Sequence, residues 1–249
     1  MRFKDKVAVI SGGSQGIGQA VAERLAAEGA SVVIGDVNLK GAQETEQKIK
    51  ENYKTNVSVL ETDVRKRDDV FNLMDSAQNE FGKIDILFNS AGICKRVTIG
   101  DITQEEWDRM IEINLRGVFF CCQAVMPFMK SQRRGRILNM ASLAGKVGGI
   151  VVGAHYSASK AGVICLTKSF AKALGPYGVT VNALAPGPVD TAMIQDWPKE
   201  VREDFAKQAP LGRVAQTEDI AEPALFLLSD AAKHITGEIL DINGGVLMD

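Results

Sequence analysis

Short runs of β-branched and apolar residues alternate along this chain with longer stretches whose apolar residues recur at helical spacing. The short runs predict strands at 6–10, 31–35, 57–60, 84–89, 136–140, 179–185 and 238–242. Strands that alternate with helices are typical of a parallel sheet with helices on both faces. We therefore expect an α/β fold with one domain over residues 1–249, built on a doubly wound, seven-stranded, mainly parallel sheet of the Rossmann type.

Three features of the sequence mark the ends of the expected helices. The first helix follows the strand at 6–10 and ends at Gly29. A long helix is expected to begin at Thr103, because Glu106 lies three residues later and completes a capping box. Another helix is expected over 157–174, and the segment 144–153 before it is glycine-rich and apolar, as suits a loop that lines a pocket.

The composition excludes several classes of protein. A charged content of 24% and a net charge of −2 give no electrostatic case for nucleic-acid or membrane binding. The polar N-terminus leads into an apolar run too short for a signal peptide, and no run is long enough to span a bilayer, so we expect a cytoplasmic chain. The four cysteines lack CxxC spacing and only two histidines are present, so we expect reduced thiols and no metal.

A glycine-rich sequence after the first strand predicts a nucleotide site. Its candidate cofactor-binding residues are Gly12, Ser14, Gln15, Gly16, Ile17 and Gly18. Glycines allow a tight turn and let backbone N–H groups approach a pyrophosphate, and the N-terminus of the following helix adds a favourable dipole. The spacing is Gly-x-x-x-Gly-x-Gly, which differs from the general dinucleotide fingerprint.

Asp36 lies at the end of the second predicted strand. A carboxylate there can accept hydrogen bonds from the ribose hydroxyls of NAD and would repel the 2′-phosphate of NADP. Neither Ser14 nor Val37 supplies a positive charge, although Lys40 is close in sequence. We therefore favour NAD as the cofactor, with a helix-capping Asp36 as the alternative.

Tyr156 and Lys160 form the candidate catalytic pair. On a helix the i, i+4 spacing places both side chains on one face. A lysine ammonium close to a phenol favours the ionised form, which lowers a pKa that is ordinarily about 10. The pair therefore predicts a tyrosine that acts as a general acid or base.

Together, the turn and the Tyr-x-x-x-Lys motif resemble the compact branch of the short-chain dehydrogenase/reductase family, and the likeness covers essentially the whole chain. Asn89-Ser90-Ala91-Gly92 is similar to the family's Asn-Asn-Ala-Gly and departs from it at Ser90. The resemblance implies further cofactor contacts at Asn89, Ala91, Gly92, Asp63, Val64, Pro186, Gly187, Val189 and Thr191, besides Tyr156 and Lys160. It also implies that Ser142 binds the substrate oxygen and that Asn114 holds a water molecule linked to Lys160.

The resemblance implies an NAD-dependent enzyme that interconverts a secondary alcohol and a ketone by hydride transfer. Because Asp36 favours NAD, we expect a small polyol, sugar or hydroxy acid as substrate, with NADH-dependent reduction of a 3-oxoacyl thioester as the alternative. A non-catalytic nucleotide sensor and a sugar epimerase of the extended branch are remote alternatives. Substrate contacts are expected from 93–96, 143–153, His155 and 192–208, with a lid at about 191–212. The family further implies a homotetramer that packs through helices near 103–130 and 157–174.

Overall fold

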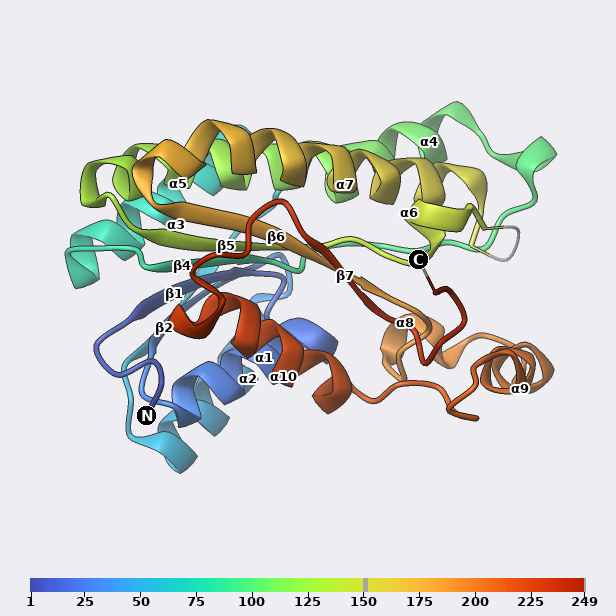
Figure 1. Cartoon of the computed structure of the whole chain (residues 1–249), viewed down its shortest axis with the longest axis horizontal. Helices are drawn as coiled ribbons and strands as arrows, with labels where there is room; N and C mark the ends of the chain where they lie inside the picture. Colours follow the sequence, from blue (N-terminus) through green and yellow to red (C-terminus); the bar gives the residue numbers. More distant parts are fainter. Residues whose placement is uncertain (150–151, 249) are drawn as a thin grey trace.

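The computed structural model describes residues 1–149 and 152–248 of the chain. Within these residues one seven-stranded sheet has the order β3-β2-β1-β4-β5-β6-β7, and every neighbouring pair is parallel (Figure 1). The strands are β1 (Val7–Ser11), β2 (Ser31–Asp36), β3 (Val57–Glu61), β4 (Ile86–Asn89), β5 (Gly135–Met140), β6 (Val179–Pro186) and β7 (Ile239–Ile242). The expected Rossmann-type sheet is thus confirmed, and it is parallel throughout.

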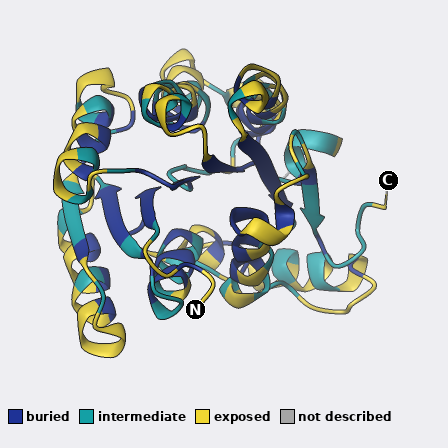
Figure 2. Cartoon of the chain, turned by 60° about the vertical axis from the view of Figure 1, so that its left-hand side comes forward, coloured by how far each residue is buried: buried dark blue, intermediate teal, exposed yellow. Residues whose placement is uncertain are grey.

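Helices cover both faces of this sheet. Figure 1 shows α1 (Gly16–Ala27), α2 (Leu39–Tyr53) and α10 (Thr217–Leu228) on one face, and α3 (Arg67–Phe81), α5 (Gly117–Gln132) and α7 (Ala154–Leu174) on the other. Successive residues of β1 serve the two layers, because Ile10 packs with the first set and Val9 with the second. The central strands β1, β4, β5 and β6 are therefore buried on both sides, shown dark blue in Figure 2, and this is why their sequences are continuous apolar runs.

The strand order reverses direction at β1, which pairs with β2 on one side and β4 on the other. The connections after these strands leave toward opposite faces, so they diverge at the carboxyl edge of the sheet. In open α/β sheets ligands bind in the crevice at such a switch point. The fold therefore predicts a binding site beside Ser11 and Asn89, which are paired in the β1–β4 register.

The expected capping box is present at the start of α4 (Gln104–Ile111). The Glu106 amide donates to Thr103 Oγ1 at 3.2 Å, and the Thr103 amide donates to the Glu106 carboxylate at 3.3 Å. The long helix predicted from this point is interrupted by a π-helical turn at Glu112–Arg116 before it continues as α5. A π-turn places one extra residue in the helix, and here it contains Asn114.

Two helix boundaries differ from the sequence prediction. The helix expected from residue 157 begins at Ala154, directly after Gly153, whose φ of +74° lies in the left-handed region. A short helix, α6 (Ala144–Val147), forms inside the segment 144–153 that was expected to be a loop. Residues 150 and 151 of that predicted segment lie outside the described residues.

The described helices include none with the length and apolar character needed to cross a membrane. No group of three or more His, Cys, Asp and Glu side chains within residues 1–149 and 152–248 is arranged to hold a metal ion. The four cysteines are free thiols, of which Cys121 and Cys122 are buried in α5.

Candidate functional site

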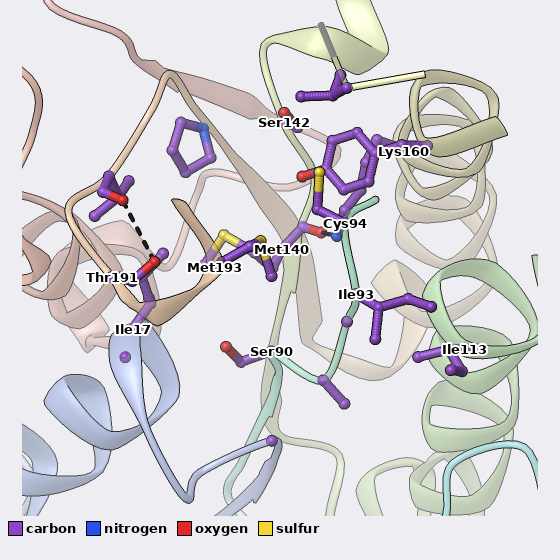
Figure 3. Close-up of a pocket in the computed structure, with 18 of the residues that line it drawn as sticks. Ile17, Ser90, Ile93, Cys94, Ile113, Met140, Ser142, Lys160, Thr191 and Met193 are labelled. Atoms are coloured by element: carbon purple, nitrogen blue, oxygen red, sulfur yellow. Dashed lines mark hydrogen bonds between the residues drawn. The ribbon is translucent and has the colours of Figure 1, made fainter. Parts of the chain in front are cut away.

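A cavity of about 710 Å³ opens at the carboxyl edge of the sheet and extends to Tyr156 (Figure 3). Its volume is in the range typical of small-molecule sites. Most residues predicted from the sequence line it, namely Gly12, Ser14, Gln15, Gly16, Ile17, Asp36, Asp63, Val64, Ala91, Gly92, Ser142, Tyr156, Lys160, Pro186, Gly187, Val189 and Thr191. Segments far apart in the sequence therefore meet in one cavity.

The glycine-rich turn is too tightly packed for side chains. A Cβ atom on Gly12 would lie 2.5 Å from the backbone of Ala91, and a Cβ on Gly18 would lie 1.8 Å from the Gly12 carbonyl oxygen. Gly18 thus packs against the turn and does not line the cavity, and its predicted cofactor contact stays a prediction. Gln15 caps α1 without any side-chain hydrogen bond, so the first amides of α1 have no side-chain cap. This cradle fits the pyrophosphate of a dinucleotide.

Asp36 is held in a fixed orientation at the edge of the cavity. Its two carboxylate oxygens accept hydrogen bonds from the amides of Ser14, at 3.0 Å, and Asn38, at 2.9 Å. Asn38 itself caps α2 by accepting from the Gly41 amide at 3.1 Å, so the alternative in which Asp36 caps this helix is wrong. Each carboxylate oxygen can accept a further hydrogen bond, as recognition of a ribose requires.

Arg65 also lines this end of the cavity, which the sequence analysis did not foresee. Its guanidinium forms an ion pair with Asp63 at 2.6 Å. The hydrogen bond from Arg65 holds the pKa of the Asp63 carboxyl below its usual range. The positive charge near the predicted ribose site is therefore largely engaged with a carboxylate.

Tyr156 and Lys160 lie one turn apart on α7, as predicted, and Ser142 follows β5. Ser142 Oγ accepts from the Ala144 amide at 3.2 Å, and the Ser142 side chain lies close enough to Tyr156 to oppose part of the shift in the pKa of that phenol. Lys160 Nζ donates to the Met140 carbonyl at 2.7 Å and lies 5.8 Å from the centroid of the Tyr156 ring. Figure 3 shows Ser142, Cys94 and Lys160 gathered at one end of the cavity.

The protonation of this pair differs from the sequence-based expectation. Burial raises the pKa of Tyr156 above its ordinary value, and the nearby Ser142 side chain only partly opposes this shift. Burial also lowers the pKa of Lys160 to about 8. The expected lowering of the tyrosine pKa by Lys160 is therefore not produced by the protein's own groups, because desolvation penalises the phenolate more strongly. Tyr156 is a neutral phenol near pH 7, ready to donate its proton.

Two predicted site residues lie behind the cavity wall and do not line it. Asn114 is fully buried, and its side-chain amide donates to Ser159 Oγ at 3.2 Å. Asn89 is 1% exposed and donates to Asn139 Oδ1 at 2.8 Å. Asn89 thus forms a hydrogen bond between β4 and β5, and both its predicted cofactor contact and the water-holding role of Asn114 stay predictions.

Apolar side chains form the end of the cavity beyond Tyr156. Tyr156 packs there with Met110, Val152, Ile194 and Trp197 in one buried cluster. From the predicted substrate segment 192–208, which contains α8 (Ala192–Gln195) and α9 (Lys199–Gln208), the cavity is lined by Ala192, Met193, Ile194, Trp197, Phe205 and Gln208. None of these side chains is charged, so this part of the cavity suits an apolar ligand.

Lys95 and Lys146, from two of the predicted substrate segments, form ion pairs with carboxylates. Lys95 forms an ion pair with Glu106, and Lys146 forms one with Asp241 at 2.5 Å. His155 is fully buried and does not line the cavity. An anionic substrate therefore finds neither lysine free.

Arg109 lines the cavity and was missed by the sequence analysis. It lies one helical turn before Ile113, which also lines the cavity, but no motif in the sequence marks either residue. Its guanidinium has no ion-pair partner among the described residues.

Comparison with known proteins gives relatives along the whole chain. A family model described as enoyl-(acyl carrier protein) reductase matches residues 12–247. A 3-oxoacyl-[acyl-carrier-protein] reductase of Thermotoga maritima is 38% identical over 248 residues, which cover 100% of each chain. The enzyme of the same name from Staphylococcus aureus is 40% identical over 246 residues, which cover 98% of each chain.

Solved structures agree with these sequence relationships. Levodione reductase superposes with a TM-score of 0.94 at 35% identity, covering 98% of each chain. The 3-oxoacyl-[acyl-carrier protein] reductase of Brucella melitensis superposes with a TM-score of 0.93 at 33% identity, covering 100% of this chain and 93% of that one. The aligned part of the chain thus spans nearly its whole length.

Proposed function

Because this chain belongs to the short-chain dehydrogenase/reductase family, we propose that it reduces the ketone of a 3-oxoacyl thioester with NADH. Members of this family are oxidoreductases that bind a nicotinamide dinucleotide. The thioester is carried by acyl carrier protein or by coenzyme A, and the product is the corresponding 3-hydroxyacyl thioester. This is the alternative that the sequence analysis placed second.

The named relatives support this alternative better than the first choice. Three of them are described as reductases of 3-oxoacyl-[acyl-carrier-protein], whereas a small polyol, sugar or hydroxy acid receives no specific support. The preference for a polyol followed from Asp36, which concerns the cofactor and carries no information about the substrate. That inference from cofactor to substrate was therefore misplaced.

The observation that carries the proposal is the apolar end of the cavity. Ile194, Trp197 and Phe205 face a substrate whose reacting carbonyl lies at Ser142 and Tyr156. A polyol would leave its hydroxyl groups without partners on such walls, and unpaired buried polar groups are costly. A hydrocarbon chain next to the ketone gains free energy from the same walls.

Each residue at the ketone has a distinct role in the proposal. The chemistry that a bound nicotinamide dinucleotide supplies is the hydride for the carbonyl carbon. Ser142 donates a hydrogen bond to the carbonyl oxygen, where negative charge develops. Tyr156, which is a neutral phenol, transfers its proton to that oxygen and completes the hydroxyl group. Lys160 lies close enough to stabilise the phenolate that remains.

The choice of NADH follows from the fixed position of Asp36. The amides of Ser14 and Asn38 orient its carboxylate, which can accept from both ribose hydroxyls and would repel a 2′-phosphate. Arg65 is a positive group that lines this end of the cavity, but its ion pair with Asp63 opposes its use as a phosphate ligand.

We also propose a homotetramer, which the family resemblance implies. Phe119 is 37% exposed on α5, and its ring lies 6.0 Å from those of Phe120 and of Phe170 on α7. Packing against a second copy of the chain would bury this aromatic surface.

A lid over residues 191–212 is part of the proposal. The structure already packs Ile194 and Trp197 near Tyr156, at 4% and 8% exposure, whereas α9 contributes no buried residue. Closure would therefore move α9 more than α8. We expect residues 199–208 to gain hydrogen-exchange protection when NADH and a 3-oxoacyl thioester bind together, and equal protection in both states would contradict a lid.

Steady-state kinetics test the proposed reaction. Purified protein is assayed with NADH against 3-oxoacyl thioesters of coenzyme A and of acyl carrier protein, and with NAD against polyols, sugars and hydroxy acids. We expect kcat/KM for the best thioester to exceed that for the best polyol by at least about tenfold, or about 1.4 kcal/mol. Turnover of a polyol with no turnover of thioesters would reject the proposal.

A further inference from the structure

A second cavity, of about 160 Å³, adjoins the substrate end of the main cavity. Gly187, Pro188 and Phe205 line both spaces, so the two are separated only by this short stretch of wall. The remaining walls come from residues 209–215 after α9 and from the C-terminal turn after β7. Gly187, a predicted cofactor contact, lines both cavities. The residues that line only the second cavity have no role assigned above in nucleotide binding or proton transfer.

Of the three shared residues, only Phe205 can move without a change in the backbone. Gly187 has no side chain, and its amide is fixed by donation to the Ile242 carbonyl at 3.0 Å. The ring of Pro188 is rigid, and its carbonyl accepts from the Ala215 amide at 3.2 Å. The side chain of Phe205 is therefore the movable part of the partition.

Phe205 lies on α9, a helix that is only partly buried along its length. None of the residues of α9 is buried. The ring of Phe205 lies 5.7 Å from that of Trp197, with the two planes tilted by 38°, and Trp197 itself is only 8% exposed. Rotation of Phe205 away from the main cavity therefore costs its ring contact with Trp197 and its packing against the apolar cluster around Tyr156, but it breaks no hydrogen bond.

The second cavity is chemically suited to a hydrocarbon chain. Ala209, Leu211, Val214, Ile242 and Val246 supply apolar walls. Two charged residues, Arg213 and Asp219, also line this cavity. They are paired with each other, because Arg213 Nη2 donates to the Asp219 carboxylate at 2.8 Å. An apolar chain would therefore leave no charge without a partner.

The polar side chain of Asn243, which also lines this space, is satisfied locally. Its oxygen accepts from the Gly245 amide at 2.9 Å, and its nitrogen donates to the Leu247 carbonyl at 3.2 Å. Nothing in the second cavity thus calls for a polar ligand.

We propose that the second cavity receives the distal end of the acyl chain of a 3-oxoacyl substrate, and that Phe205 is the movable partition that admits it. The inference rests on the proposed function, since the ketone is held at Ser142 and Tyr156 while the chain extends past Trp197. Short substrates end before the partition and do not use the second cavity. Long substrates displace Phe205 and fill it.

Two substitutions that act in opposite directions test the inference. Val246→Phe fills the second cavity from a position that does not line the main one, and Phe205→Ala removes the partition. Met248→Phe is the matched control, because Met248 is 77% exposed on the same C-terminal segment and lines neither cavity. The measured quantity is the ratio of kcat/KM for the 3-oxododecanoyl thioester to kcat/KM for the acetoacetyl thioester, both on coenzyme A.

We expect this ratio to fall at least about tenfold in Val246→Phe, to rise several-fold in Phe205→Ala and to match the wild type in Met248→Phe. If Val246→Phe does not fold, Phe205→Ala tests the inference by itself. A rise in its ratio supports the inference, and an unchanged or lower ratio contradicts it. A ratio that neither cavity variant alters, or a wild type that reduces only the acetoacetyl thioester, overturns the inference and leaves the proposed function standing. A wild type that reduces no thioester overturns both.

Discussion

The side-chain amide of Asn114 pairs with both backbone groups of Ile93. Asn114 Oδ1 accepts from the Ile93 amide at 2.8 Å, and Asn114 Nδ2 donates to the Ile93 carbonyl at 2.8 Å. The π-helical turn therefore fixes the loop after β4, which carries Ala91 and Gly92 into the cavity. Since Asn114 also bonds to Ser159 on α7, one buried side chain sets the distance between this loop and the catalytic helix.

Asn114→Ala should consequently destabilise the fold and loosen this loop. The substitution leaves the half-buried amide and carbonyl of Ile93 without these partners, at a cost of about 1–3 kcal/mol in the free energy of unfolding. Urea titration measures the loss, and hydrogen exchange should show faster exchange at residues 90–96. Asn79→Ala, at an exposed position of α3, is the control and should change stability by less than about 0.5 kcal/mol. Unchanged exchange at 90–96 would show that Ile93 is held by other contacts.

Tyr156→Phe should abolish turnover while the fold and dinucleotide binding persist. The substitution keeps the ring that packs with Met110 and Trp197, and it removes the proton that the proposed reaction needs. We expect kcat to fall at least about a hundredfold, because general acids contribute that much or more. Assays of NADH oxidation and a titration of NADH binding by fluorescence measure the two properties separately. Tyr177→Phe, outside the cavity, should retain full activity, and a Tyr156→Phe variant that did the same would exclude the general-acid role.

Replacement of Asp36 tests the cofactor preference. We expect kcat/KM of the wild type to be at least about tenfold higher with NADH than with NADPH, which corresponds to about 1.4 kcal/mol. Asp36→Ala should narrow this gap, because it removes both the ribose acceptor and the repulsion of a 2′-phosphate. Lys40→Ala is the control, since Lys40 is exposed and does not line the cavity. Equal use of both cofactors by the wild type, with loss of NADPH use in Arg65→Ala, would instead assign the 2′-phosphate to Arg65.

Buried Lys160 should make stability depend on pH in a defined window. Burial lowers its pKa in the folded protein from 10.5 to about 8, so between these values the unfolded chain binds more protons. The contribution of Lys160 to the free energy of unfolding therefore rises as the pH increases from about 8 to about 10.5. Below about pH 8 this contribution is constant, because Lys160 is protonated in both the folded and the unfolded chain. The difference is worth about 3 kcal/mol.

Urea titrations of the wild type and of Lys160→Met across this window measure the effect. The wild type should gain stability relative to the variant as the pH rises, because only the wild type carries the buried ammonium. Lys172→Met, on the exposed side of α7, should follow the wild type. A constant difference between the wild type and Lys160→Met would mean that the ammonium is better solvated than its burial indicates.

Light scattering tests the proposed assembly. We expect a mass about four times the chain mass of 26.8 kDa at micromolar concentration. Phe119→Glu should lower that mass, because it places a charge within the aromatic surface shared by α5 and α7. Tyr53→Glu is a matched control, since Tyr53 is also 37% exposed but lies on α2. A monomer mass for the wild type would reject the tetramer.

The sequence by itself determined the fold class, the order of the elements and most of the residues around the cavity. Strands that are buried on both faces have continuous apolar sequences, and the glycines of a tight turn occur at a characteristic spacing. Local patterns therefore predicted the strands of the sheet and the site residues Gly12, Tyr156 and Lys160. These features depend on neighbours within a few residues. That is why the capping box at Thr103 and the shared face of Tyr156 and Lys160 were predicted correctly.

Only the tertiary structure decided what each side chain faces. Asn89 and Asn114 carry the same sequence signal as cavity residues, yet both lie behind the wall, because strand register and a π-turn set their direction. The pKa of Tyr156 is raised rather than lowered, since burial depends on packing from Met110, Val152 and Trp197, which come from distant segments. Arg109 on α4 and the second cavity behind Phe205 were likewise found only in the tertiary structure, because the walls of each cavity come from segments that are far apart in the sequence.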